Sequence, residues 1–374
     1  MRRWLPILIV MFGFVAVGSP RADAELHPTV PLKKAAAVEI VTNLKAALLK
    51  YYVNEEKAQT MAADLERRLA AGEYDLPDTR ALAKKLTDDT RAIAGDKHLN
   101  VFTTPPGAEF PEFDPSEPTE PTPDELRKAA KAYEPVNYGI SRTDRLAGNI
   151  GLLELQNFWN GPGLKERLEA SFKLLAATDA LIVDVRQNGG GDPQAVALLV
   201  SYFLKGKTHV NSFVHRGAAR IEDFYSDPSV APKYLGKPVI VLTSKYTFSG
   251  AEEFAYDMQA LKLATIIGEV TGGGANPGTF MPLADGMAVQ MPYAEARNPI
   301  TRTNWEGVGV HPDIELSSDS AFYQAHLKLL KEVLTGQEAR KKGVDPNYGA
   351  HASADENRLA QDAIEKKLAA LATK

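Results

Sequence analysis

The chain of 374 residues contains no cysteine. This absence excludes disulfide bonds, a thiol nucleophile, a thiolate metal site and the attachment of a lipid to an N-terminal cysteine. A net charge of -5 gives no sign of a surface that binds nucleic acid. Its histidine, aspartate and glutamate residues form no group with the spacing of metal ligands, so neither a metal nor an organic cofactor is expected.

Long hydrophobic runs are also lacking beyond the start of the chain. Met1–Ala24 begins with two arginines, Arg2 and Arg3, before the apolar segment Leu5–Val17, and it ends in the small residues Ala22-Asp23-Ala24. This pattern is typical of a secretory signal peptide cleaved after Ala24, and the apolar segment is too short for a stable membrane span. We therefore expect a secreted or periplasmic protein of about 350 residues with more than one core.

The amino-acid composition of the mature sequence changes after Phe102. Residues 25–102 are rich in Ala, Leu, Lys and Glu, with apolar faces at helical spacing. They predict an N-terminal helical domain of three or four helices and a short final strand. Residues 103–137 contain the proline-dense stretch Thr103–Pro123, which predicts a linker or exposed flap without packed structure.

The second half alternates strand and helix patterns over residues 138–317. Some of its strands, such as Ala180–Val185, are continuous apolar runs. Such strands joined by helices predict an α/β domain whose sheet is buried on both faces. Residues 318–374 predict two C-terminal helices, at 320–334 and 354–371, that pack on the domain or on another copy of the chain.

Ser249 lies in the segment with the clearest pattern. Val239–Thr243 is a β-branched apolar run that predicts a buried strand, and helical spacing begins at Gly250. Another strand is predicted at Ala264–Gly268. Ser249 therefore lies where a strand leads through a turn into a helix. This location suits a nucleophile, because a helix N-terminus offers unpaired N–H groups to an oxyanion that forms beside the hydroxyl.

The same tetrapeptide also has a purely structural interpretation. Ser249-Gly250-Ala251-Glu252 fits a capping box, in which the serine hydroxyl accepts a helical N–H and the glutamate reaches back to the serine N–H. Capping boxes are common wherever helices begin, so this tetrapeptide alone favours a cap.

Three consecutive glycines, Gly189-Gly190-Gly191, follow the strand at Ala180–Val185 and precede a predicted helix at 194–203. At a turn of this kind, backbone N–H groups can face a ligand without side chains in the way. A plain tight turn is the alternative. A phosphate-binding loop is disfavoured because no Lys-Ser or Lys-Thr follows the glycines.

Four motifs occur in order along the chain. They are Asp184-Val-Arg-Gln-Asn-Gly-Gly-Gly, Thr247-Phe-Ser-Gly-Ala-Glu-Glu, Gly268-Glu-Val-Thr-Gly-Gly-Gly and Gly307-Val-Gly-Val-His-Pro-Asp. This set resembles the C-terminal processing (tail-specific) peptidase family, in particular the branch with the repeat modules of interphotoreceptor retinoid-binding protein. The resemblance implies a helical N-terminal domain, then an α/β catalytic domain of the ClpP/crotonase type with a mixed sheet, and C-terminal helices.

The resemblance also implies roles for single residues. The family's nucleophile matches Ser249, but Gly274 stands at the position of the family's lysine base. In the tricorn-type relatives, histidine and glutamate replace that lysine, and their counterparts here are His98 and Glu306. Such a set is chemically coherent, because an imidazole can take the serine proton at neutral pH and a carboxylate can fix its tautomer.

The backbone N–H groups of Gly250 and of Gly190 or a neighbouring glycine are the implied oxyanion donors. The reaction would be hydrolysis of peptides or unfolded protein tails through an acyl-enzyme. His98 and Glu306 each have a structural alternative, which for Glu306 is an ion pair with Arg302 or Arg297.

A different class of function remains open beside the peptidase. The same fold could carry a hydrophobic ligand or a peptide without catalysis, and several aromatic residues are expected near the cleft. They are Phe158, Trp159, Phe248, Phe254 and Tyr256. Aromatic residues at this spacing more often belong to a core than to a ligand site. A structural periplasmic scaffold is a third alternative, which rests only on the terminal helices.

Overall fold

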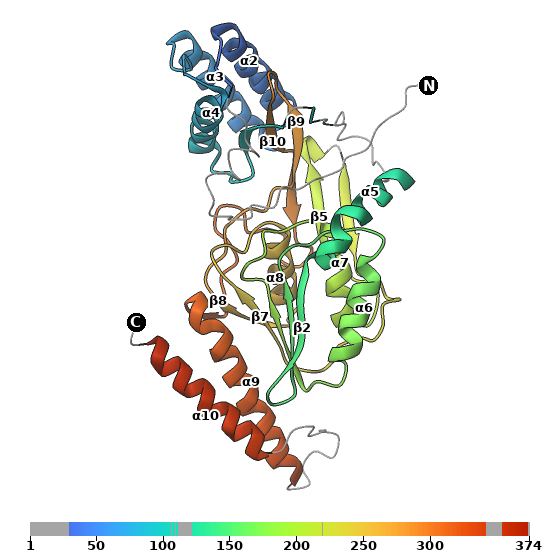
Figure 1. The fold of residues 1–374 in the computed structure, drawn as a ribbon. Coiled ribbons are helices and arrows are strands. Elements are labelled where there is room, and N and C mark those ends of the chain that lie inside the picture. Colours follow the sequence, from blue (N-terminus) through green and yellow to red (C-terminus); the bar gives the residue numbers. More distant parts are fainter. Residues whose placement is uncertain are drawn as a thin grey trace. The chain divides into compact units, whose positions relative to one another are not determined.

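The computed structural model describes residues 30–105, 107, 108, 110, 122–218, 220–341 and 354–372 (Figure 1). They form two compact units, each described here by itself. The first comprises Met1–Glu125, Ser212–Asp223 and Gly274–Arg297, and the second comprises Leu126–Asn211, Phe224–Gly273 and Asn298–Lys374. The units are thus discontinuous in sequence, unlike the contiguous domains that we predicted. The predicted signal peptide and most of the proline-dense stretch lie outside the described residues.

Three helices form most of the first unit. They are α2 (Lys34–Tyr51), α3 (Glu55–Ala70) and α4 (Thr79–Ala94). The side chain of Asn54 accepts the N–H of Lys57 at the start of α3. Asp78 accepts the N–H of Ala81 at the start of α4, which ends at Gly95 in the left-handed conformation (φ 68°). Only glycine adopts this conformation without strain, so Gly95 fixes where the chain leaves the helix.

A three-stranded antiparallel sheet completes the core of the first unit. Its order is β1 (Asn100–Thr103), β10 (Met287–Pro292) and β9 (Gly278–Pro282). Val101 lies opposite Val289, and both pack in one cluster with apolar residues of the three helices. This pairing explains why Gly274–Arg297 joins the first unit although it follows the Ser249 segment in sequence. A further antiparallel sheet has the order β11 (Ala294–Arg297), β5 (His209–His215) and β6 (Ile221–Tyr225).

A mixed six-stranded sheet forms the centre of the second unit. Its order is β12 (Ile314–Glu315), β8 (Thr265–Gly268), β7 (Val239–Thr243), β4 (Ala180–Asp184), β3 (Ile150–Leu155) and β2 (Ile140–Leu146). Only β2 runs antiparallel to its neighbour. All five residues of β4 and of β7 are buried, as their continuous apolar sequences predict.

Helices cover both faces of this sheet. Ile182 and Ile240 pack in one cluster with residues of α9 (Ser318–Lys341), whereas the alternate residues Val183 and Val241 are fully buried on the opposite face. Figure 1 shows α6 (Leu164–Leu175), α7 (Pro193–Val200) and α8 (Gly250–Ala260) beside the strands. The helices that follow β4 and β7 are therefore held firmly, and their N-termini lie where these two adjacent parallel strands end.

The remaining helices differ in part from the sequence-based expectation. The first C-terminal helix, α9, is longer than predicted, and α10 (Ala354–Leu371) packs against it over the predicted range. Helix α5 (Pro123–Tyr133) occupies part of the predicted linker. Among the described residues, no helix combines the length and the apolar character needed to cross a membrane.

Candidate active site

Ser249 lies at the turn between β7 and α8, where the sequence predicts it. Its backbone has φ 52° and ψ -123°, whereas an ordinary helix cap is extended. Such a conformation costs about 1–3 kcal/mol and persists mainly at functional sites. The half-buried side chain therefore stands on a strained turn that a cap alone does not require.

The turn is fixed to the segment that follows β4. The N–H of Ser244 donates to Thr247 Oγ1 (2.9 Å), and the Thr247 hydroxyl donates to the carbonyl of Val185 (2.9 Å). The N–H of Phe248 donates to the carbonyl of Asn188 (3.1 Å). These bonds join the serine turn to the glycine turn at residues 189–191.

Gly190 approaches the serine turn so closely that no side chain fits there. A methyl group on Gly190 would lie 2.7 Å from Ser249 Cβ, 2.8 Å from the Phe248 carbonyl oxygen and 2.9 Å from Gly250 N. Gly190 also has φ 105°, which L-residues rarely adopt. The triple-glycine turn is therefore more than a generic tight turn, because only the absence of a side chain at Gly190 allows Ser249 to lie so close.

We expect Gly190→Ala to destabilise the second unit by about 3 kcal/mol or more, because the new methyl group meets backbone atoms and the residue is strained. Chemical denaturation measures this change. Gly189→Ala is the matched control, since a methyl group there meets no atom within 4 Å. Equal unfolding midpoints for the two variants would contradict the tight approach of the two turns.

The amides of the glycine turn are not equivalent. The N–H of Gly190, which we predicted as an oxyanion donor, donates to Asn188 Oδ1 (2.8 Å) and is thus engaged within its own turn. The N atom of Gly191 lies 3.0 Å from the position that a methyl group on Gly250 would occupy. The amide of Gly191 therefore lies beside Gly250, which makes Gly191, one of the neighbouring glycines that the sequence left open, the candidate donor.

Glu252 connects the serine turn to a second loop. This carboxylate is completely buried. One oxygen accepts the N–H of Ser249 (2.9 Å), as the capping box predicts, and the other accepts the Thr271 hydroxyl and the N–H of Gly273 (2.6 Å). Thr271 Oγ1 in turn accepts the N–H of Val310 (2.7 Å). Glu252 thus links the serine backbone to the loops at residues 271–273 and 305–310.

Glu306 lies in the second of these loops. The preceding residue, Trp305, is buried and packs on Tyr256 of α8, with ring centroids 5.2 Å apart. The N–H of the following Gly307 donates to the carbonyl of Gly273 (3.0 Å). The half-buried Glu306 is therefore carried by a loop that is anchored on both sides to the serine helix or to its partner loop.

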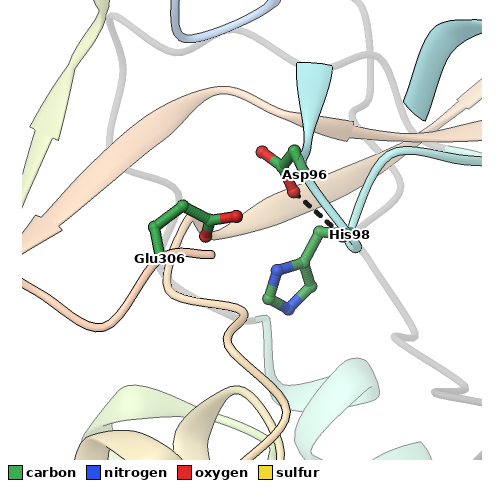
Figure 2. Close-up of side chains that lie close together, drawn as sticks. All are labelled: Asp96, His98 and Glu306. Atoms are coloured by element: carbon green, nitrogen blue, oxygen red, sulfur yellow. Dashed lines mark hydrogen bonds between the residues drawn. The ribbon is translucent and has the colours of Figure 1, made fainter. Parts of the chain in front are cut away.

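His98 lies in the first unit, three residues after the left-handed Gly95. Figure 2 shows Asp96 and His98 side by side, with Asp96 Oδ1 accepting the backbone N–H of His98 (2.9 Å). Asn276 donates to the other oxygen of Asp96 (2.9 Å). Burial lowers the pKa of the His98 imidazole, and Arg91 lowers it further, whereas Asp96 partly raises it. A buried imidazole of this kind is neutral, as a general base must be.

The predicted site residues thus fall in both units. Ser249, Gly250 and Gly190 are brought together in the second unit, and Glu306 is linked to them through the Glu252 network. His98 belongs to the first unit. Sequence reasoning treated Glu252 only as a cap and gave no role to Asp96 or Asn276.

Those omissions have different causes. The Asp96-x-His98 spacing is a local turn pattern that the sequence could have revealed. The contact of Asn276 with Asp96 and those of Glu252 with Thr271 and Gly273 join residues far apart in the chain. No local pattern signals such contacts.

The second unit is thus an α/β unit with a strained serine turn, and the first unit is mainly helical. Residues 149–316 match the model of peptidase family S41, and residues 29–136 match the model described as the N-terminal domain of Peptidase_S41 in eukaryotic IRBP. The chain belongs to peptidase family S41. The predicted resemblance and the predicted fold class are thereby confirmed.

Individual relatives agree with this family. A carboxy-terminal-processing protease of Bartonella bacilliformis is 30% identical over 177 residues, which cover 46% of this chain and 39% of that protein. The tricorn protease of Thermoplasma volcanium is 26% identical over 187 residues, which cover 49% of this chain and 17% of that protein. This chain therefore spans less than half the length of either relative. The crystal structure of mature CPAF has the same fold, with a TM-score of 0.53 at 13% identity, over 83% of this chain and 98% of that chain.

Proposed function

We propose that this peptidase is of the serine type and cleaves peptide bonds through an acyl-enzyme, with Ser249 as nucleophile, His98 as general base and Glu306 as the carboxylate that orients the imidazole. The observation that carries the proposal is the strained backbone of Ser249 at the start of α8, against a glycine turn, in a family S41 chain. Strain of this kind is retained where it presents a reactive group.

In the proposed reaction, His98 takes the hydroxyl proton while Ser249 Oγ attacks the carbonyl carbon of the peptide. The oxygen of the tetrahedral intermediate accepts hydrogen bonds from the N–H groups of Gly250 and Gly191. The imidazolium then gives its proton to the leaving amine, and the C–N bond breaks. Water, deprotonated by the same imidazole, hydrolyses the ester and restores Ser249.

The substrates that we propose are peptides or unfolded protein tails. The name of the Bartonella bacilliformis relative, a carboxy-terminal-processing protease, supports this class. We further propose that the protein acts outside the cytoplasm, on the basis of the signal-peptide pattern at Met1–Ala24.

A fluorophosphonate probe tests the serine mechanism directly, because it reacts with an activated serine and changes the intact mass of the protein. We expect one adduct on the wild-type protein and none on Ser249→Ala. His98→Ala should label far more slowly, since the hydroxyl then lacks its base. A wild-type protein that resists the probe would overturn the serine mechanism and favour a ligand-binding role for the same fold.

The fall of kcat/KM at acidic pH tests whether His98 is the general base. Because the pKa of His98 is lowered from 6.5, the imidazole stays neutral in mildly acidic solution. We expect kcat/KM to fall only as the pH drops below 6.5, with the midpoint under that value. His311→Ala, which removes an exposed histidine, should leave this fall unchanged. A midpoint above 6.5 in the wild type would argue against His98 as the base.

A further inference from the structure

Two carboxyl groups of α8 are buried without a countercharge. Glu253 and Asp257 are four residues apart, so they lie on one face of the helix, and they are 3% and 0% exposed. Glu253 Oε1 and Asp257 Oδ2 have no hydrogen-bond partner among the described residues. Among the residues that the structure describes, no lysine, arginine or histidine forms an ion pair with the carboxyl group of Glu253 or of Asp257. Two buried charges without compensation would be very costly, so at least one carboxyl must be neutral.

The groups that surround Glu253 and Asp257 also favour neutral carboxyl groups. The pKa of Glu253 is raised to about 8, chiefly by burial, with a smaller contribution from Asp192 at the start of α7, while the amide of Asn211 opposes the shift. Burial also raises the pKa of Asp257, as does the neighbouring Glu253, while a hydrogen bond from Asn298 lowers it. Both carboxyl groups therefore favour the protonated form near neutral pH.

Asp257 contacts the residue that organises the next turn. Asn298 is almost completely buried, and its Nδ2 donates to Asp257 Oδ1 (2.9 Å) and to the carbonyl of Val210 (3.3 Å). Its Oδ1 accepts the N–H groups of Ile300 (2.9 Å) and Thr301 (3.2 Å). All four hydrogen-bonding positions of this side chain are thus used.

The turn that Asn298 organises leads directly to Glu306. The N–H of Asn298 donates to the carbonyl of Thr303 (3.0 Å), which closes the turn. The adjacent Tyr256 donates its hydroxyl to Thr301 Oγ1 (2.9 Å) and packs on Trp305. One turn of α8 therefore holds the whole segment from Asn298 to Trp305.

We propose that Asp257 is a positioning residue, held as a neutral carboxylic acid beside Glu253, which fixes the turn before Glu306 through Asn298. A neutral acid suits this task because its carbonyl oxygen accepts the Asn298 amide, while the helix carries no uncompensated charge next to the serine. The catalytic consequence rests on the proposed role of Glu306. The protonation state of Asp257 and the position of the turn are independent of the role of Glu306.

Three variants of the full-length protein test the proposal. Asp257→Asn keeps the shape and the acceptor oxygen of a neutral acid, Asp257→Ala removes them, and Asp319→Asn alters an exposed acid as control. We expect Asp257→Asn to keep the wild-type kcat and KM. Asp257→Ala should lower kcat by about tenfold or more with little change in KM, because a displaced positioning group affects the reacting geometry.

Stability against pH tests the protonation without any substrate. The folded-state pKa values of both carboxyl groups are raised. The stabilisation from Glu253 is therefore complete below its ordinary pKa of 4.5 and is lost as the pH rises through about 8, and the stabilisation from Asp257 is likewise lost as the pH rises. We expect the unfolding midpoint of the wild type to fall across this window. The unfolding midpoint of Asp257→Asn should fall less over the same pH range, and that of the double variant Asp257→Asn/Glu253→Gln should change little. The midpoint of the Asp319→Asn control should fall as in the wild type.

The position of the turn is read from Trp305 fluorescence in a background with Trp4 and Trp159 replaced by Phe. We expect a shifted emission in Asp257→Ala and an unchanged one in Asp257→Asn. If Asp257→Asn shifts the emission as strongly as Asp257→Ala, or gains stability when a divalent cation is added, an ionised carboxylate is needed and the proposal is wrong. A wild-type protein without peptidase activity, but with these stability and fluorescence results, would refute only the proposed function.

Discussion

Replacement of Ser249 by alanine is expected to reduce peptide hydrolysis by roughly 10⁵- to 10⁶-fold in kcat, the loss typical of removing a serine nucleophile. The other aliphatic hydroxyls of the turn, on Ser244 and Thr247, are buried and donate to backbone carbonyls, so neither is expected to replace it. KM should change little, because binding depends on the groups around the turn. The measurement is the initial rate of cleavage of a fluorogenic unstructured peptide, with and without Ser249→Ala.

The strained backbone supplies a sharp control for this result. Alanine is strained at φ 52° as serine is, so Ser249→Ala should leave the free energy of unfolding within about 0.5 kcal/mol of the wild type. Glycine adopts positive φ freely, so Ser249→Gly should be more stable by about 1 kcal/mol while equally inactive. A fully active Ser249→Ala variant, or a less stable Ser249→Gly variant, would refute the interpretation of this turn.

The elements that the sequence predicts well are those specified by local patterns. The run Val239–Thr243 is a strand because its β-branched side chains are apolar on both faces, and helical spacing fixes the start of α8 at Gly250. The serine between them is consequently placed correctly. Asn188 is an intermediate case, because an Asn two residues before Gly190 is a local signal that the amide of Gly190 is engaged.

The features that escaped prediction depend on pairing between distant segments. β10 joins β1 although the paired residues Asn100 and Gln290 are 190 positions apart, and its sequence MAVQMP contains a proline and no strong alternation of polar and apolar residues. The contiguous domain boundaries therefore missed the segment Gly274–Arg297. Asp257 was missed for another reason: a polar residue within a helix predicts exposure, and only the packed structure shows it to be completely buried.

Replacement of Glu252 by alanine is expected to have the second large effect, on stability and on rate together. Three donors lose their acceptor in this variant: the N–H groups of Ser249 and Gly273 and the hydroxyl of Thr271. Each buried donor without a partner costs about 1–3 kcal/mol, so the free energy of unfolding should fall by about 3 kcal/mol or more. The serine turn and the Glu306 loop lose their common anchor, and kcat should fall by about 10²-fold.

The size of this effect distinguishes an organising carboxylate from a simple helix cap. Loss of a cap alone costs about 1 kcal/mol and needs no change in kcat. Glu252→Gln keeps one acceptor oxygen but turns an NH₂ group toward a donor, so we expect an intermediate loss of stability. Glu315→Ala, at an exposed position, serves as control. Denaturation midpoints and peptide hydrolysis rates of the three variants decide between the two interpretations: if Glu252→Ala loses only the stability of a cap and keeps its kcat, the network does not position Ser249.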